Sequence, residues 1–261
     1  MQLSGRVVLL TGASRGLGRA LARALAERGA RVACVARDAE ALDDVVREVG
    51  ARGATARAYR FDLSAADRCA ALLERVEADL GPVAVVLCNA ATTTAGEVRD
   101  LSLSHYESDL RVNFLSAVAL TRAALPGMLA RGDGAFAYVL SGAALRPLPA
   151  FSSYSATKAA LLAFAGSLRV ELAGEPIRVL TVFPGTLRTE FLERMNRVGS
   201  PRLLAARRSS DPARIAALLV RALERDRSRL FVRGPAWLVH QLDHFAPAFV
   251  DRLLARQLRR S

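Results

Sequence analysis

Short apolar runs alternate with longer amphipathic stretches along almost the whole chain, and this order constrains the fold more than any other feature. The apolar runs, each bounded by turn residues, lie near 6–11, 31–36, 56–61, 83–88, 134–140, 177–183 and 229–233. The stretches between them place apolar residues at helical spacing and cover 17–28, 39–52, 65–80, 104–131, 152–173 and 212–227. Strands that alternate with helices form a parallel sheet with helices on both faces. We therefore predict one α/β domain built on a doubly wound, seven-stranded parallel sheet flanked by helices.

Two of the expected helices carry a recognisable start signal. Ser64 precedes the third helical stretch with Asp67 three positions later, and Asp211 stands before Pro212 at the start of the last one. Short polar side chains cap the free N–H groups of a first turn, and proline fits the first helical position. The sequence has no internal repeat and no linker that divides it. Residues 1–234 are therefore predicted to form the main body, and residues 235–261 a C-terminal helical extension of the same domain.

Composition argues against several classes of protein. No apolar run approaches the roughly 20 residues that a membrane-spanning helix needs. The N-terminus lacks the basic start and the cleavage site of a secretory signal. The cysteines Cys34, Cys69 and Cys88 are odd in number and never form a CxxC pair, so neither disulfides nor a metal site are predicted. These features predict a cytoplasmic protein.

The balance of charge is basic, with 37 basic against 25 acidic residues and a net charge of +12. The arginines are scattered along the helical stretches and do not form a basic block interleaved with aromatic residues, so no nucleic-acid partner is predicted. All but one of the basic residues are arginine, and the exception is Lys158. Its retention in so arginine-rich a chain indicates that the position needs a compact ammonium group.

A glycine-rich loop follows the first strand and leads directly into the first helix. It reads Thr11-Gly-Ala-Ser-Arg-Gly-Leu-Gly18. Glycines permit a tight turn and let the main chain approach a pyrophosphate, whose charge then faces the N–H groups of the helix start. This context predicts a dinucleotide-binding site in residues 1–234, on a fold of the Rossmann type.

The TGxxxGxG spacing of this loop resembles that of the short-chain dehydrogenase/reductase family, and the resemblance extends over about residues 5–233. Further motifs follow in the family's order, with Cys88-Asn-Ala-Ala91 resembling its NNAG and Pro184-Gly-Thr-Leu-Arg-Thr189 its PGxxxT. Cys88 and Ala91 depart from the pattern, which predicts a small change of backbone path over the cofactor. The cofactor residues that the resemblance implies, besides Tyr154 and Lys158, are Gly12, Ser14, Arg15, Gly16, Leu17, Gly18, Arg37, Asp62, Leu63, Asn89, Ala90, Pro184, Gly185, Leu187 and Thr189.

The charge after the second strand indicates which nicotinamide cofactor is bound. An acidic residue there would accept a hydrogen bond from the ribose of NAD, whereas arginine pairs with the 2′-phosphate of NADP. By alignment with the family, Ala36 stands where an NAD-preferring member has its acid, and Arg37 follows it. Arg15 in the glycine loop adds a second cation. The prediction is NADPH/NADP+.

Reduction of a carbonyl needs a hydride from the cofactor and a proton from a positioned acid. The sequence Tyr154-Ser-Ala-Thr-Lys158 places a tyrosine and a lysine on one face of a helix, where we expect the ammonium to lower the pKa of the phenol. Ser141 and Asn113 complete the family's set. The resemblance implies that Tyr154 donates the proton, Ser141 binds the substrate oxygen, Lys158 also holds the ribose, and Asn113 keeps a water relay.

Apolar residues near this set predict a lipophilic ketone or alcohol as the substrate, with Leu145, Phe151 and Phe191 as contacts. Local core packing explains such residues equally well. Segment 188–210 resembles the family's substrate lid. The basic, amphipathic residues 235–261 are expected to dock on the body or on a second subunit, with peripheral membrane contact as the alternative.

Several functions fit these features. The leading hypothesis is an NADPH-dependent ketone reductase, with a weak resemblance to 3-ketodihydrosphingosine reductases. A 3-oxoacyl-carrier-protein reductase and a noncatalytic NADPH-binding sensor or scaffold are the alternatives. The family's habit of pairing through the helices expected at 104–131 and 152–173 implies a homodimer or homotetramer.

Overall fold

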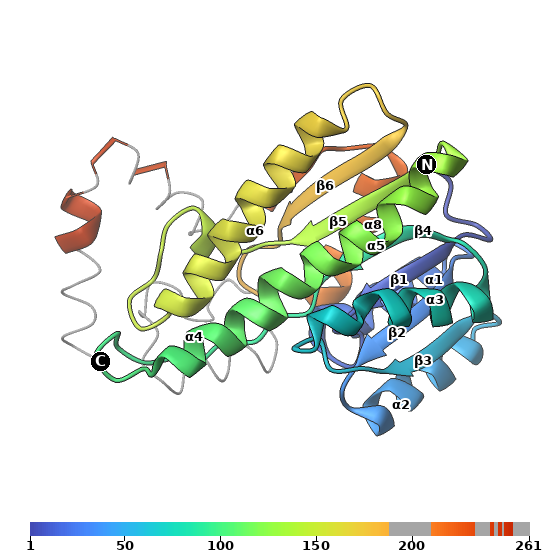
Figure 1. Cartoon of the computed structure of the whole chain (residues 1–261), viewed down its shortest axis with the longest axis horizontal. Helices are drawn as coiled ribbons and strands as arrows, with labels where there is room; N and C mark the ends of the chain where they lie inside the picture. Colours follow the sequence, from blue (N-terminus) through green and yellow to red (C-terminus); the bar gives the residue numbers. More distant parts are fainter. Residues whose placement is uncertain (188–209, 233–240, 243–244, 247, 253–261) are drawn as a thin grey trace.

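The computed structural model describes residues 1–187, 210–232, 241–242, 245–246 and 248–252, and it contains the predicted sheet (Figure 1). The strands are β1 Val7–Thr11, β2 Arg31–Ala36, β3 Ala56–Arg60, β4 Val83–Cys88, β5 Gly134–Val139, β6 Ile177–Phe183 and β7 Arg229–Phe231. Their order is β3-β2-β1-β4-β5-β6-β7, and every neighbouring pair is parallel. The doubly wound, seven-stranded α/β fold is therefore confirmed.

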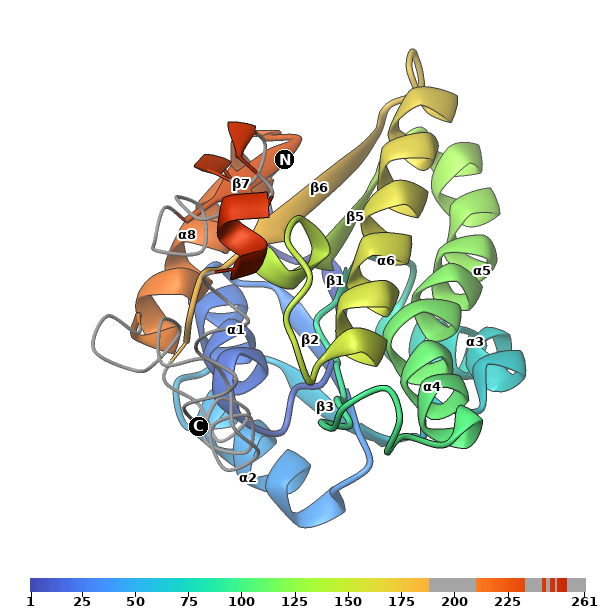
Figure 2. The same ribbon diagram turned by 90° about the vertical axis from the view of Figure 1, so that its left-hand side faces the viewer.

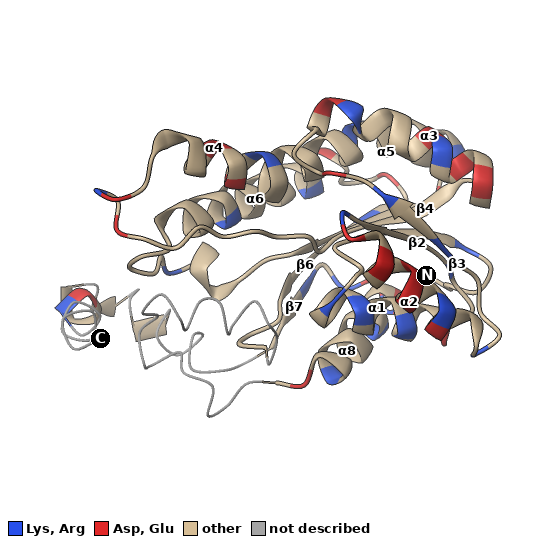
Figure 3. Ribbon diagram, turned by 90° about the horizontal axis from the view of Figure 1, so that it is seen from below, with Lys and Arg blue, Asp and Glu red and all other residues tan. Residues whose placement is uncertain are grey.

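Helices cover both faces of the sheet (Figures 2 and 3). On one face lie α1 Gly16–Ala26, α2 Ala39–Gly50 and α8 Pro212–Glu224. On the other lie α3 Cys69–Leu80, α4 Leu103–Leu110, α5 Ser116–Arg131 and α6 Ser152–Glu171. Each layer buries its own apolar cluster against the sheet, because the central strands are apolar on both faces.

The stretch expected as one helix over 104–131 is divided into three parts. A π-helical turn, η2, covers Arg111–Leu115 and joins α4 to α5, with the buried Asn113 at its centre. Such turns insert one extra residue into a helix and often mark functional sites. The π-helical turn therefore places the polar side chain of Asn113, within a long core helix, beside the site described below.

By length and apolar composition, Leu103–Arg131 is the one helical stretch among the described residues that would be able to cross a membrane. Apolar residues of this stretch pack in the core, since Leu120, Ala124 and Met128 are buried in the apolar cluster on one face of the sheet. Core helices of soluble proteins pass the same test of composition, so the stretch is weak evidence for a membrane span.

Of the two predicted helix starts, one is confirmed and one is wrong. The Asp211 carboxylate accepts from the N–H of Ala213 at 3.1 Å and caps α8. Ser64 does not cap the third helix, which begins with a 3₁₀ turn, η1, over Ala66–Arg68 without a side-chain cap. Instead, the N–H of Ser64 donates to Asp62 at 3.0 Å, because the chain makes a tight turn as it leaves β3.

The strand order reverses between β1 and β4, which are neighbours in the sheet. In open α/β sheets the loops at the carboxyl ends of the strands separate at such a point and form a crevice for a ligand. Here the loops after β1 and β4 meet at that edge, and the loops after β2, β5 and β6 lie beside them. The predicted cofactor and catalytic residues within the described part of the chain lie in these loops, in the loop after β3, at the start of α1, in η2 or in α6.

Candidate active site

The glycine loop after β1 is packed so closely that two of its glycines have no room for a side chain. Gly12 has a φ of +67°, and a Cβ atom there would lie 2.8 Å from the Cα of Ala90. A Cβ atom on Gly18 would lie 1.8 Å from the carbonyl oxygen of Gly12. The loop therefore turns tightly into the N-terminus of α1, where main-chain N–H groups can bind a pyrophosphate.

Asn89 and Thr11 hold this loop against the end of β4. The Thr11 hydroxyl accepts from the N–H groups of Asn89 and Ala90 at 3.0 and 3.1 Å. The Asn89 amide donates to the carbonyl oxygens of Thr11 and Gly12 at 3.1 and 3.2 Å. Asn89, predicted as a cofactor contact, thus shapes the loop through its side chain. Thr11 was not among the predicted site residues, although a threonine that ends a fully buried strand is a recognisable signal.

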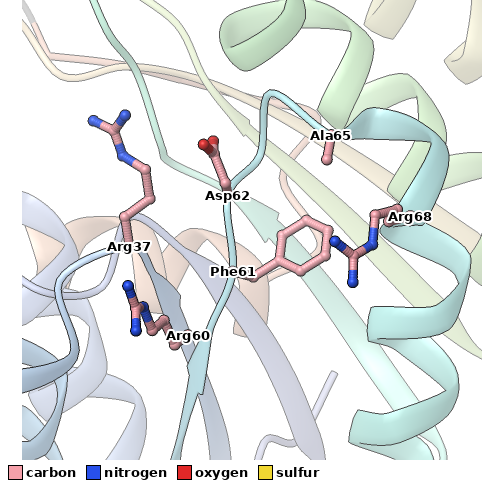
Figure 4. A pocket seen from close by; sticks show the side chains of 6 residues that line it. All are labelled: Arg37, Arg60, Phe61, Asp62, Ala65 and Arg68. Atoms are coloured by element: carbon pink, nitrogen blue, oxygen red, sulfur yellow. The ribbon is translucent and has the colours of Figure 1, made fainter.

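A cavity of about 310 Å³ opens beside the loop after β2, at the end where the adenosine half of a dinucleotide is expected (Figure 4). The residues that line it are Arg37, Arg60, Phe61, Asp62, Ala65 and Arg68. The hydrogen bond from the N–H of Ser64 lowers the pKa of Asp62, which is therefore an acceptor at neutral pH. Arg37 and Asp62 are the predicted contacts, whereas Arg60 and Arg68 are new. Three guanidinium groups and one aromatic ring fit an adenosine that carries a phosphate.

The three candidate reacting residues come together where β5 ends and α6 begins. Tyr154 and Lys158 lie one turn apart on α6 and are 6% and 2% exposed. The ammonium of Lys158 lies 5.8 Å from the centre of the Tyr154 ring and donates to the carbonyl oxygen of Val139 at 2.9 Å. Ser141, two residues after β5, is hydrogen-bonded to the Tyr154 hydroxyl. The structure thus brings the predicted serine, tyrosine and lysine together.

Burial controls the ionisation of this group. It raises the pKa of Tyr154 to about 12, and the hydrogen bond with Ser141 acts against this rise. Burial also lowers the pKa of Lys158 to about 8. The expected lowering of the tyrosine pKa by the lysine is therefore wrong for this arrangement, because loss of hydration is the larger effect. At neutral pH Tyr154 holds its proton and Lys158 is charged, the states that a proton donor and its cationic neighbour need.

Asn113 fixes the loop after β4 to α6. Its Oδ1 atom accepts from the N–H of Thr92 at 2.8 Å, and its amide donates to the carbonyl oxygen of Thr92 at 2.9 Å. The same amide donates to the Thr157 hydroxyl at 3.0 Å. Both amide hydrogens are thus used within the protein, and the side chain acts as a structural clamp. The water relay stays a prediction.

The residues predicted to contact the substrate have different surroundings. Leu145 is partly buried at the edge of the core. Phe151 is 0% exposed and packs on Ala143 and Tyr154, so it supports the tyrosine ring and offers no surface to a substrate. Phe191 lies outside the described residues.

The motif after β6 is described only in part. Pro184 and Gly185 follow the strand directly, with Gly185 at a φ of +71°. Leu187 forms an isolated bridge with Ser210. Thr189 and almost all of segment 188–210 lie outside the described residues.

Comparisons with known proteins agree with this geometry. The model of the short chain dehydrogenase family matches residues 6–198. The ketoacyl reductase HetN of Nostoc sp. is 34% identical over 257 residues, which cover 96% of this chain and 88% of that protein. A solved metagenomic short-chain oxidoreductase in complex with NADP has a TM-score of 0.76 and 32% identity, covering 90% of this chain and 99% of that one. A short-chain dehydrogenase from Streptomyces avermitilis has a TM-score of 0.81 and 30% identity, covering 100% and 99%.

Proposed function

The chain belongs to the short-chain dehydrogenase family and is an oxidoreductase that binds NADP(H), and from this premise we propose that it reduces a ketone on a lipophilic substrate. The buried arrangement of Ser141, Tyr154 and Lys158 at the carboxyl edge of the sheet carries this proposal. Bound NADPH supplies the hydride. Oxidation of the corresponding alcohol is the same reaction in reverse, with the proton returning to Tyr154.

The protein's own residues provide the proton and hold the oxygen. As the carbonyl oxygen of the substrate gains negative charge, the O–H bond of Tyr154 breaks and its proton goes to that oxygen. The Ser141 hydroxyl donates a hydrogen bond to the same oxygen and orients it. The charge left on the tyrosine is stabilised by the ammonium of Lys158, which the carbonyl of Val139 holds near the ring. Above a pH of about 8 the Lys158 ammonium loses its proton, and it then no longer stabilises the charge on the tyrosine.

Arg37 is expected to give the preference for NADPH. In the Arg37→Ala variant the ratio of kcat/KM for NADPH to that for NADH should fall by about tenfold or more, since a charge-assisted pair with phosphate is lost. Only kcat/KM for NADPH should fall, and kcat/KM for NADH should stay unchanged. Arg47→Ala is the matched control, because Arg47 is a 77% exposed arginine on α2 and makes an ion pair with Asp44. Steady-state kinetics with both cofactors measure the ratio. An equal loss with NADH would contradict the assignment.

The surroundings of Tyr154 support the proposed substrate class. The partly buried Leu145 and Leu148 follow Ser141 in the chain, and an apolar wall with few polar groups suits a lipophilic ketone of the long-chain type. A 3-oxoacyl thioester on a carrier protein is the second candidate, and the similarity to a protein named as a ketoacyl reductase favours it. Both substrates present the same carbonyl chemistry to Tyr154.

NADPH oxidation with a panel of ketones tests the proposed function. The panel contains long-chain ketones, steroid ketones and 3-oxoacyl thioesters, with the matching alcohols and NADP+ for the reverse direction. Turnover of any of them establishes a reductase and excludes the noncatalytic sensor, and the preferred class identifies the substrate. NADPH binding without turnover of the whole panel would favour the sensor.

We propose that the protein is a cytoplasmic homodimer or homotetramer, paired through α5 and α6. The exposed apolar residues Leu129 on α5 and Val170 on α6 support this pairing. The C-terminal extension docks on the body in this proposal, because Val250 is 1% exposed and Asp251 forms an ion pair with Arg146. The exposed Phe245 and Phe249 support the alternative of peripheral membrane contact.

A further inference from the structure

A buried carboxylate that the proposed reaction does not use lies one helical turn before Asn113. Asp109 is 1% exposed and is the one buried residue of the eight that form α4. The buried face of a helix is normally apolar, and a carboxylate is costly to bury unless it is hydrogen-bonded. Its position therefore needs an explanation from its contacts.

Asp109 joins two segments that are far apart in the sequence. Its Oδ2 atom accepts from the Ser153 hydroxyl at 2.8 Å and from the N–H of Thr94 at 3.1 Å. Its Oδ1 atom is buried and has no hydrogen-bond partner among the described residues. Ser153 lies in the first turn of α6, and Thr94 lies in the loop after β4. One carboxylate thus ties that loop to the start of the helix that carries Tyr154.

The contacts of Asp109 repeat those of Asn113 one turn away. Asn113 binds the main chain of Thr92 and the hydroxyl of Thr157, and Asp109 binds the main chain of Thr94 and the hydroxyl of Ser153. Asp109 and Asn113 are four residues apart, and so are their partners Ser153 and Thr157 on α6. Their partners in the loop after β4, Thr92 and Thr94, are two residues apart. The two parallel bridges form what we term the polar ladder, consisting of Thr92, Asn113 and Thr157 in one rung and Thr94, Asp109 and Ser153 in the other.

Each rung of the polar ladder ends beside a reacting residue. Thr157 immediately precedes Lys158, and Ser153 immediately precedes Tyr154. On the basis of the proposed function, we propose that Asp109 is a positioning residue that holds Tyr154 in place for proton transfer, as Asn113 does for Lys158. It acts through Ser153 and does not touch the reacting atoms.

The local structure explains why Tyr154 needs such support. It lies in the first turn of α6, and the residue before that helix, Phe151, provides no side-chain cap. Uncapped first turns leave N–H groups without partners and fray. A carboxylate near the N-terminus of a helix is also favoured by the helix dipole. Asp109 therefore fixes this turn at its weak end and holds the tyrosine hydroxyl in register with Ser141.

Three variants test the positioning role kinetically. Asp109→Ala should lower kcat by about tenfold to a hundredfold, because small displacements of a reacting group have effects of this size, while the KM for NADPH stays within about twofold. Ser153→Ala should lower kcat in the same way but to a smaller extent. Asp109→Asn retains an oxygen that accepts both hydrogen bonds and should restore kcat to within about threefold of the wild type.

Tyr106→Phe is the matched control. The Tyr106 hydroxyl bonds to the Ser152 hydroxyl at 2.8 Å and joins the same two helices beside the ladder. Its loss should leave kcat unchanged. If Asp109→Ala does not fold, Ser153→Ala decides, since it removes only one hydroxyl. Wild-type kcat in both variants, or an equal loss in Tyr106→Phe, would overturn the proposal.

A measurement without turnover separates this proposal from the reductase assignment. The chain has four tyrosines, so ¹³C-tyrosine NMR with Tyr154→Phe as the reference identifies the Tyr154 ring signal. That signal should shift in Asp109→Ala and Ser153→Ala and stay in place in Tyr106→Phe. An inactive wild type with this pattern would contradict the proposed function but support the positioning role. A Tyr154 signal unmoved by both ladder variants would overturn the positioning role whatever the activity.

Discussion

Tyr154→Phe is expected to remove nearly all reduction while NADPH binding stays within about twofold of the wild type, since only a hydroxyl is lost. General acid catalysis contributes roughly 10²–10⁴-fold, and kcat should fall by an amount in this range. The phenol keeps its proton at neutral pH because burial raises its pKa to about 12. Fluorescence titration with NADPH and stopped-flow oxidation measure the two quantities separately.

Tyr138→Phe provides the matched control for this variant. The Tyr138 hydroxyl is buried in β5 and is hydrogen-bonded to the Thr121 hydroxyl at 2.7 Å. Its removal should lower the free energy of unfolding by about 1 kcal/mol, the ordinary value of such a bond, and leave kcat unchanged. If Tyr154→Phe kept most of its rate, the proton would have to come from another group, and the assignment of Tyr154 would be wrong.

The second large effect is expected at the cofactor loop. In Gly18→Ala the new methyl group would lie 1.8 Å from the carbonyl oxygen of Gly12, a main-chain atom that can move only with the loop. The loop must therefore open, and the N–H groups that face the pyrophosphate are displaced. We expect NADPH affinity to fall by at least about a hundredfold, and the free energy of unfolding by about 1–3 kcal/mol, the usual cost of overpacking.

Gly166→Ala is a control with the same chemical change. Gly166 lies within α6, and a Cβ atom there would have no neighbour within 4 Å. Alanine in the interior of a helix is favoured over glycine by about 1 kcal/mol, so this variant should be more stable and should bind NADPH normally. Isothermal titration and thermal unfolding give both readouts. Wild-type affinity in Gly18→Ala would show that the loop does not hold the cofactor.

The sheet was predictable because most of its strands are short, apolar and bounded by turn residues. All five residues of β1 and all six of β4 are buried. A short run that is apolar on both faces is typical of a central strand in a parallel sheet covered by helices on both sides. The break in the long helix at Arg111–Leu115 was not predictable. A π turn changes hydrogen bonding by one residue and leaves the apolar pattern on either side almost intact, so periodicity does not reveal it.

The reacting residues were predictable from spacing, but their ionisation was not. Tyr154 and Lys158 four residues apart must lie on one face of a helix. The direction of their pKa shifts depends on burial. For Tyr154 this burial includes packing against Phe151 and against Ala143 in the segment after β5. Asp109 was missed for a related reason, since nothing in the sequence distinguishes a buried aspartate in a polar helix from an exposed one.

Transfer of deuterium from NADPH that carries deuterium at both positions of the reactive ring carbon tests the central claim most directly. With a ketone that the panel identifies, mass spectrometry of the alcohol product should show one deuterium on the carbinol carbon, and Tyr154→Phe should form almost none of this product. Consumption of labelled NADPH that leaves the product alcohol without deuterium would contradict the account, because the cofactor would then not be the hydride donor at this site.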